Sequence, residues 1–164
     1  MNVYDYAMKV EKEGEAYYRE LAAKSPNDGL KKVFTILADA EVKHYQVFKS
    51  MRDKDGQDIN ALDISTDTKT IFETLSSQKN SVDLNQDDVK YYEDAIKRED
   101  ESYAFYVTKA KELTDENEKT IFMNIAQEEI KHKEILENIL VFIQEPDNWI
   151  GSAEFFKNHQ LSII

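Results

Sequence analysis

The chain has 164 residues, enough to bury the core of one domain without disulfides or a structural metal. It contains no cysteine, which excludes disulfide frameworks, thiolate-bound zinc, iron–sulfur clusters and cysteine nucleophiles, and suits a reducing cytosol. The formal net charge of −12 disfavours contact with nucleic acid or anionic membranes, and no uncharged apolar run approaches the length of a membrane span. We therefore expect a cytoplasmic protein with neither nucleic-acid nor membrane partners.

The first half of the chain predicts two helices joined by a short turn. Glycine and proline are rare, and the long segments rich in Glu, Lys, Ala and Leu carry apolar residues at helical spacing. The first helix is predicted over residues 3–24, because residues 25–29 supply turn-forming side chains. The second is predicted over residues 30–52, before a Gly-containing break at residues 53–56. We expect these two helices to be antiparallel neighbours.

The second half repeats this plan after a long connection. Residues 56–84 have a weak apolar pattern and predict a crossover with one short helix at residues 67–77. A third helix is expected from the N-capping residue Asn85 to about residue 113, and a fourth over residues 115–144. Two short turns flanking one long crossover are typical of the ferritin-like four-helix bundle. The predicted fold is all-α.

The end of the chain differs in composition from the helices. We assign residues 1–145 to the bundle and treat residues 146–164 as a separate C-terminal tail. This tail contains the apolar side chains Trp149, Ile150, Phe155 and Phe156. They are more apolar than a free tail requires, so we expect the tail to dock against the bundle or a partner subunit.

One offset of 88 residues aligns the two halves of the chain. It relates Glu11 to Glu99, Glu41 to Glu129 and His44 to His132 without a gap. The same offset also pairs Tyr4 with Tyr92, Tyr18 with Tyr106, Phe34 with Phe122, and Lys43 with Lys131. We infer that the bundle is built from a duplicated helical hairpin.

The repeat also places acidic side chains inside apolar stripes. The glutamate and histidine of each Glu-x-x-His motif lie on one face of their helix. Glu11 and Glu99 each lie two helical turns from a tyrosine, Tyr18 and Tyr106, on the same helix face. Four buried carboxylates without counter-charges would be very unfavourable. Two divalent cations balance four carboxylates, and two neutral imidazoles add ligands without charge. We therefore predict a dinuclear metal site with the ligands Glu11, Glu41, His44, Glu99, Glu129 and His132.

The ligand types narrow the choice of metal. Mixed carboxylate and imidazole ligation with open positions favours iron or manganese over a closed structural zinc site or an all-oxygen calcium site. One glutamate from each of two helices and a Glu-x-x-His motif from each of the other two is the ligand pattern of di-iron and di-manganese carboxylate bundles.

Several residues near these motifs have more than one interpretation. Tyr18 and Tyr106 are either donors that hold the ligand carboxylates, possible redox groups, or simply part of the core. Gly14 and Ser102 lie one turn after Glu11 and Glu99, where small side chains leave space for an oxidant, although Gly14 is equally compatible with an incidental role. We expect Glu128 to be solvated, because it lies about 100° around the helix from Glu129.

The motifs resemble those of rubrerythrin-like proteins in the ferritin-like superfamily. Residues 11–22, EKEGEAYYRELA, and residues 37–44, LADAEVKH, look like the first two helices of that family, and their second-half copies look like its last two. The resemblance covers about residues 3–143. It implies that the six predicted ligands bind iron, that Glu41 and Glu129 bridge the ions, and that the diferrous centre reduces hydrogen peroxide or dioxygen.

Two departures from the rubrerythrin pattern refine this expectation. Rubrerythrins usually have a further ligand glutamate where this chain has Ser102, so the ligand set is closer to the six of bacterioferritin. Complete rubrerythrins also carry a four-cysteine rubredoxin-like domain, and this chain has no cysteine. We therefore expect a separate electron donor, such as a rubredoxin. The resemblance also implies a homo-oligomer, with a dimer favoured.

Two alternative functions remain open at this stage. One is iron oxidation and storage in a ferritin-like or bacterioferritin-like cage, although no long fifth helix is evident after Pro146. The other is a metal-free structural or interaction bundle. Iron content and particle size separate these alternatives from the redox function.

Overall fold

The computed structural model describes residues 2–25, 27–54, 63–77 and 86–144. These residues form five helices and no strands, which confirms the predicted all-α class. In chain order the helices are α1 (Val3–Lys24), α2 (Asp28–Asp53), α3 (Thr68–Ser77), α4 (Gln86–Glu112) and α5 (Glu116–Gln144). None of the described helices is both long and apolar enough to cross a membrane.

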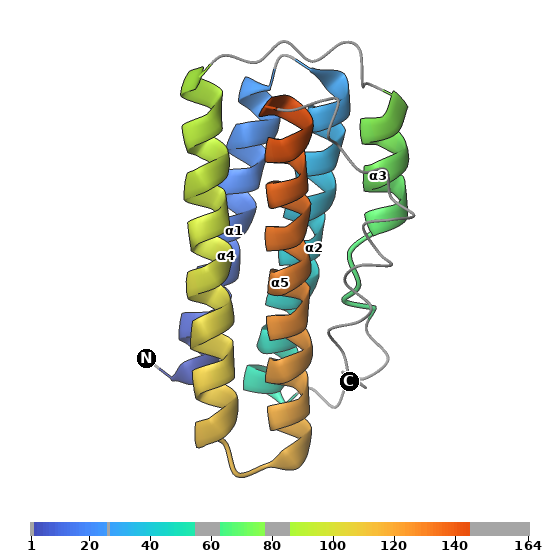
Figure 1. The fold of residues 1–164 in the computed structure, drawn as a ribbon. Coiled ribbons are helices and arrows are strands. Elements are labelled where there is room, and N and C mark those ends of the chain that lie inside the picture. Colours follow the sequence, from blue (N-terminus) through green and yellow to red (C-terminus); the bar gives the residue numbers. More distant parts are fainter. Residues whose placement is uncertain (1, 26, 55–62, 78–85, 145–164) are drawn as a thin grey trace, which may run out of the picture.

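The four long helices form a ferritin-like bundle (Figure 1). Helix α1 is antiparallel to α2, and α4 is antiparallel to α5, so each half of the chain forms one hairpin. Helices α2 and α4, which belong to different hairpins, run in the same direction. The short helix α3 packs against α2 on the outside of the bundle.

Side-chain caps explain where the helices begin. Helix α1 has the predicted bounds, and the Asn2 side chain accepts a hydrogen bond from Asp5 N at 2.8 Å. Helix α2 begins two residues earlier than predicted, because the Asn27 side chain accepts a hydrogen bond from Leu30 N at 3.0 Å. Asp115 caps α5 in the same way. The predicted cap Asn85 and the tail over residues 146–164 lie outside the described residues.

The core consists of two apolar clusters at different levels of the bundle. One includes Leu30, Phe34, Leu37, Leu136 and Ile139, together with Ile71 and Leu75 of α3. The other includes Ala7, Val47, Phe48, Tyr106, Phe122 and Ile125. Along each long helix the residues of the two clusters are separated by a buried glutamate. The four buried glutamates therefore lie between the two apolar clusters.

Candidate metal centre

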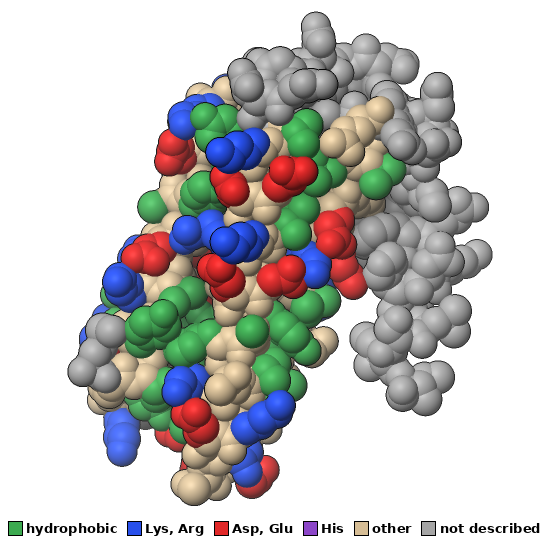
Figure 2. Space-filling view, turned by 60° about the vertical axis from the view of Figure 1, so that its left-hand side comes forward, with side chains coloured by type: hydrophobic (Ala, Val, Ile, Leu, Met, Phe, Trp, Pro, Cys, Tyr) green, Lys and Arg blue, Asp and Glu red, His purple; other side chains and the backbone are tan. Residues whose placement is uncertain are grey.

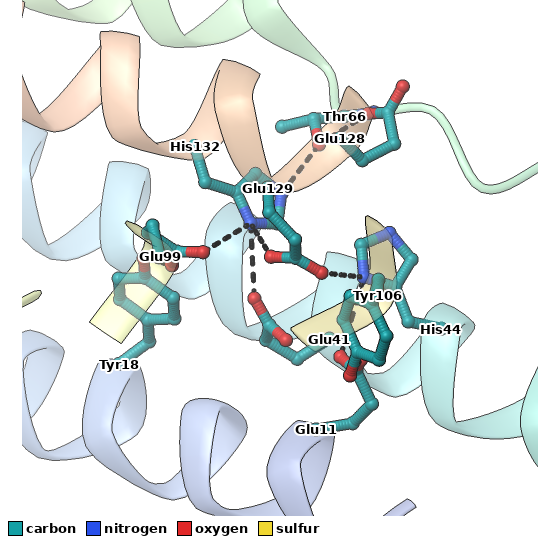
Figure 3. A network of polar contacts seen from close by, with 10 residues as sticks. All are labelled: Glu11, Tyr18, Glu41, His44, Thr66, Glu99, Tyr106, Glu128, Glu129 and His132. Atoms are coloured by element: carbon teal, nitrogen blue, oxygen red, sulfur yellow. Dashed lines mark hydrogen bonds and ion pairs between the residues drawn. The ribbon is translucent and has the colours of Figure 1, made fainter. Parts of the chain in front are cut away.

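All six predicted ligands meet at the middle of the bundle (Figure 3). Helices α1 and α4 each contribute one glutamate, while α2 and α5 each contribute a Glu-x-x-His pair. A spacing of three residues places both side chains of each pair on the inner face of their helix. All six side chains are buried, with none more than 5% exposed: Glu11, Glu41, His44, Glu99, Glu129 and His132.

The six side chains form two overlapping groups of potential ligands. In each group one ligand atom per residue lies within 4.8 Å of the others. The first group contains Glu11, Glu41, His44 and Glu129, and the second contains Glu41, Glu99, Glu129 and His132. Both groups share one glutamate from α2 and one from α5, so the arrangement has the symmetry of the sequence repeat.

The histidines turn the same ring nitrogen toward the carboxylates. Nδ1 of His44 lies 3.4 Å from Glu11 Oε2 and 3.2 Å from Glu129 Oε1. Nδ1 of His132 lies 3.1 Å from Glu41 Oε1 and 3.4 Å from Glu129 Oε2. The two carboxylate oxygens of Glu129 are thus divided between the two histidines. The imidazole rings are nearly parallel, with centroids 5.6 Å apart.

Many polar atoms of this cluster have no hydrogen-bond partner. Among the described residues, the buried side-chain atoms without a partner are Glu11 Oε2, Glu41 Oε1, Glu129 Oε1, both ring nitrogens of His44, His132 Nδ1 and, outside the cluster, Asn138 Nδ2. Buried polar groups are normally satisfied, and each exception requires an explanation. Each of the two groups offers four carboxylate or imidazole ligand atoms, and this set of ligands fits a pair of divalent cations.

The electrostatics of the cluster without a cation are correspondingly unfavourable. Burial and the nearby charge of Glu129 raise the pKa of Glu99 to about 8. Burial, together with Glu129 and Glu11, also raises the pKa of Glu41 well above its usual range. Burial acts in the same direction on Glu129, but its contacts with His132 and His44 outweigh this and lower its pKa. Protons would therefore compete with any metal ion for Glu41 and Glu99.

The two tyrosines identified in the sequence contact glutamates of the opposite hairpin. Tyr18 on α1 donates a hydrogen bond to Glu99 on α4, and Tyr106 on α4 donates one to Glu11 on α1. Burial and the charge of Glu99 raise the pKa of Tyr18 well above its usual range, and burial and Glu11 do the same for Tyr106. Both phenols therefore keep their protons and act as donors.

Residues 2–140 match the family model described as Rubrerythrin. The chain belongs to the rubrerythrin family. No curated protein and no solved structure matches the chain significantly. Rubrerythrins are ferritin-like di-iron carboxylate proteins, and the buried glutamates and histidines of this bundle can hold metal ions. The family match and the clustered carboxylate and imidazole groups therefore both indicate a metal-binding bundle.

In this rubrerythrin, a small cavity between α1 and α4 borders the cluster of six buried side chains. The cavity measures about 20 Å³, and its lining includes Glu41, Glu99, Gly14, Ser102 and Arg98. A Cβ atom on Gly14 would lie only 3.1 Å from Glu41 Oε2. The glycine therefore makes room for the glutamate as well as for the cavity.

The prediction that Glu128 is solvated is wrong. Glu128 is not solvated but 5% exposed, because Thr66 from the crossover covers it. Glu128 lies one helical turn before His132, and this spacing is the sequence signal that could have placed it on the histidine's side of the helix. Thr66 lies in a weakly patterned segment, and the sequence offered no signal for its role.

Proposed function

We propose that this rubrerythrin is a di-iron oxidoreductase that reduces hydrogen peroxide or dioxygen with electrons from a separate donor. The observation that carries the proposal is the pair of overlapping, buried donor groups that share Glu41 and Glu129. In this proposal two iron ions would share Glu41 and Glu129, the residues common to both donor groups. Glu11 with His44 completes one half of the centre, and Glu99 with His132 completes the other.

The proposed chemistry needs ligands that tolerate a change in metal charge. Bound iron would supply two electrons, one from each ion, for reduction of the O–O bond. Carboxylates suit this role because they shift between bridging and terminal binding. Tyr18 and Tyr106 would steady Glu99 and Glu11 during such shifts, since each phenol donates to the carboxylate of the other hairpin.

The small volume of the cavity between α1 and α4 supports the proposal that the substrate is a small oxidant. A site of about 20 Å³ exceeds the roughly 10–15 Å³ that one water molecule needs, but it is too small for an organic substrate.

Figure 2 turns the left-hand side of Figure 1 forward and shows acidic and basic side chains interleaved with hydrophobic ones. Arg98 stacks on Tyr17 at the cavity, with 5.1 Å between the guanidinium carbon and the ring centroid.

The proposed reaction needs an external source of electrons. The 164 residues contain no cysteine, so they cannot form a rubredoxin-like iron site. We assign electron delivery to a separate protein, such as a rubredoxin, and we propose that the chain works as a small homo-oligomer, most simply a dimer.

Anaerobic iron titration followed by stopped-flow mixing tests this function. The metal-free protein is titrated with Fe(II) and then mixed separately with hydrogen peroxide and with dioxygen. We expect two Fe(II) ions per chain and faster oxidation by peroxide. If peroxide oxidises the centre no faster than dioxygen, hydrogen peroxide is not the preferred oxidant, and if neither oxidises it, the proposed function fails. The double variant Glu41→Ala/Glu129→Ala serves as a control, and tight Fe(II) binding by that variant would refute the assignment of the site.

A further inference from the structure

The crossover reaches the centre through Thr66, just before α3. Lys43 of α2 donates a hydrogen bond to the Ser65 carbonyl oxygen at 3.0 Å and so holds this segment against the bundle. The Ser65 backbone N–H in turn donates to Asp63 Oδ1 at 3.0 Å. The Asp67 side chain caps the first turn of α3 by accepting a hydrogen bond from Thr70 N at 3.0 Å. Thr66 is thus fixed on both sides and is only 8% exposed.

Thr66 connects His132 to a buried carboxylate (Figure 3). Its hydroxyl oxygen lies 2.8 Å from His132 Nε2 and 3.1 Å from Glu128 Oε2. The backbone N–H of Thr66 also donates to Glu128 Oε2, at 3.0 Å. A carboxylate accepts hydrogen bonds and the hydroxyl has a single proton, so Thr66 donates to Glu128 and accepts from His132 Nε2–H. In the neutral ring, the form that binds a metal ion, this leaves Nδ1 of His132 as the bare nitrogen that faces Glu41 and Glu129.

The carboxylate at the end of this chain of contacts is itself balanced. Lys131 donates to Glu128 Oε1 at 2.5 Å, and half of the Lys131 side chain remains exposed. Glu128 therefore stays buried as an acceptor without an uncompensated charge. We call Thr66 and Glu128 together the His132 brace.

Among the residues that the structure describes, none braces the other half of the centre in this way. The 88-residue offset places Ala40 where α5 has Glu128, and alanine accepts no hydrogen bond from its side chain. His44 is fully buried, yet within the described residues its Nε2 has no hydrogen-bond partner. The duplication therefore matches the two halves in their ligand types but not in the contacts behind the histidines.

We infer that the His132 brace makes the two metal positions unequal, so that the half formed by Glu41, Glu99, Glu129 and His132 binds its ion first. This inference rests on the proposed metal centre. A hydrogen bond to the non-ligating nitrogen fixes the tautomer and orientation of a ligand histidine and strengthens it as a ligand, and loss of such a partner costs roughly 10- to 100-fold in metal affinity. Thr66 is a positioning residue that acts through His132.

A cobalt titration of the full metal-free chain tests the inference. Co(II) uptake is followed by visible absorption in the parent chain and in Thr66→Val, which keeps the shape but loses the hydroxyl. We expect two unequal affinities in the parent, with the tighter one weakened about 10- to 100-fold by the valine. Thr66→Ser restores the hydroxyl and should restore the tighter affinity. Thr74→Val, the same exchange on α3, should leave both affinities unchanged.

A second readout separates positioning from general loosening of the fold. In proton NMR of the chain with one equivalent of Co(II), we expect one shifted imidazole N–H signal that exchanges slowly with solvent, in the parent and in Thr66→Ser. The slow exchange should be lost in Thr66→Val. Two equal affinities in the parent, or parental affinities in Thr66→Val, would overturn the inference while leaving the metal centre intact. Failure of the parent chain to bind any Co(II) would instead overturn the proposed function, and the inference with it.

Discussion

Tyr18 on α1 donates a hydrogen bond to Glu99 on α4 and thereby connects the two copies of the duplicated hairpin at the centre. Its counterpart Tyr106 donates to Glu11 in the reverse direction. Each hairpin therefore orients a carboxylate of the other. This exchange makes the geometry of the site depend on correct packing of both hairpins.

Removal of either phenol should weaken metal binding in one half of the centre. In Tyr18→Phe, Glu99 loses its donor, and we expect Fe(II) affinity to fall by roughly 10-fold or more. Tyr106→Phe should act in the same way on the half that contains Glu11. Anaerobic calorimetric titration measures both effects. Tyr103→Phe on α4, outside the cluster, is the matched control, and equal effects from Tyr103→Phe and Tyr18→Phe would contradict this explanation.

Gly14→Ala should separate stability from metal binding. Alanine stabilises a helix interior by about 1 kcal/mol relative to glycine, so the metal-free variant should unfold at the same temperature or slightly higher. The new Cβ would lie 3.1 Å from Glu41 Oε2 and displace that carboxylate, so Fe(II) affinity should fall. Ser102→Ala, at the equivalent position of the second half, adds no atom and should preserve affinity. Unchanged affinity in Gly14→Ala would show that Glu41 moves freely.

The metal-free protein should lose stability as the pH rises from about 5 to 8. The pKa of Glu99 is about 8 in the folded chain against an ordinary value of 4.5, so within this range the folded chain binds more protons than the unfolded chain. The raised pKa of Glu41 acts in the same direction, as do those of His44 and His132 above pH 6.5. One pKa unit corresponds to about 1.4 kcal/mol, so the loss should be on the order of a few kcal/mol.

Urea unfolding of the metal-free chain at pH 5.5 and pH 8 measures this loss. The lowered pKa of Glu129 has the opposite effect, but only below its ordinary value of 4.5, and so does not interfere in this range. Glu99→Gln should flatten the pH dependence, because it removes one of the titrating groups. Saturating Mn(II) should stabilise the parent more at pH 8 than at pH 5.5. Greater stability of the metal-free parent at pH 8 would refute this prediction.

Iron content and particle size should distinguish the redox function from iron storage. A redox centre of six ligands predicts about two iron ions per chain in a small oligomer. Size-exclusion chromatography with light scattering, combined with metal analysis after aerobic iron loading, measures both quantities. A very large assembly with many iron atoms per chain would favour storage instead.

Local spacing was sufficient to predict the helices and the six clustered side chains. Residues 3–24 form α1 as predicted, and the 88-residue offset relates the two Glu-x-x-His pairs in the sequence alone. Helix periodicity determines which face a side chain occupies, and a repeat determines which faces are equivalent. These two facts place Glu11, Glu41, Glu99 and Glu129 in the core.

Contacts between distant segments could not be predicted in the same way. Periodicity placed Tyr18 on the face of Glu11, but its hydroxyl contacts Glu99, because the partner depends on how the two hairpins pack. The burial of Glu128 depends on Thr66, 62 residues earlier, in a segment without a clear apolar pattern. Such long-range packing overrides the helical wheel, which describes one helix at a time.

Anomalous diffraction from crystals grown after anaerobic Fe(II) loading tests the metal centre most directly. Data collected on both sides of the iron absorption edge locate iron without reference to activity. We predict two peaks inside the cluster, one near His44 and Glu11 and the other near His132 and Glu99, with Glu41 and Glu129 between them. Absence of iron from this cluster in fully loaded crystals would contradict the assignment of these six residues as a di-iron centre.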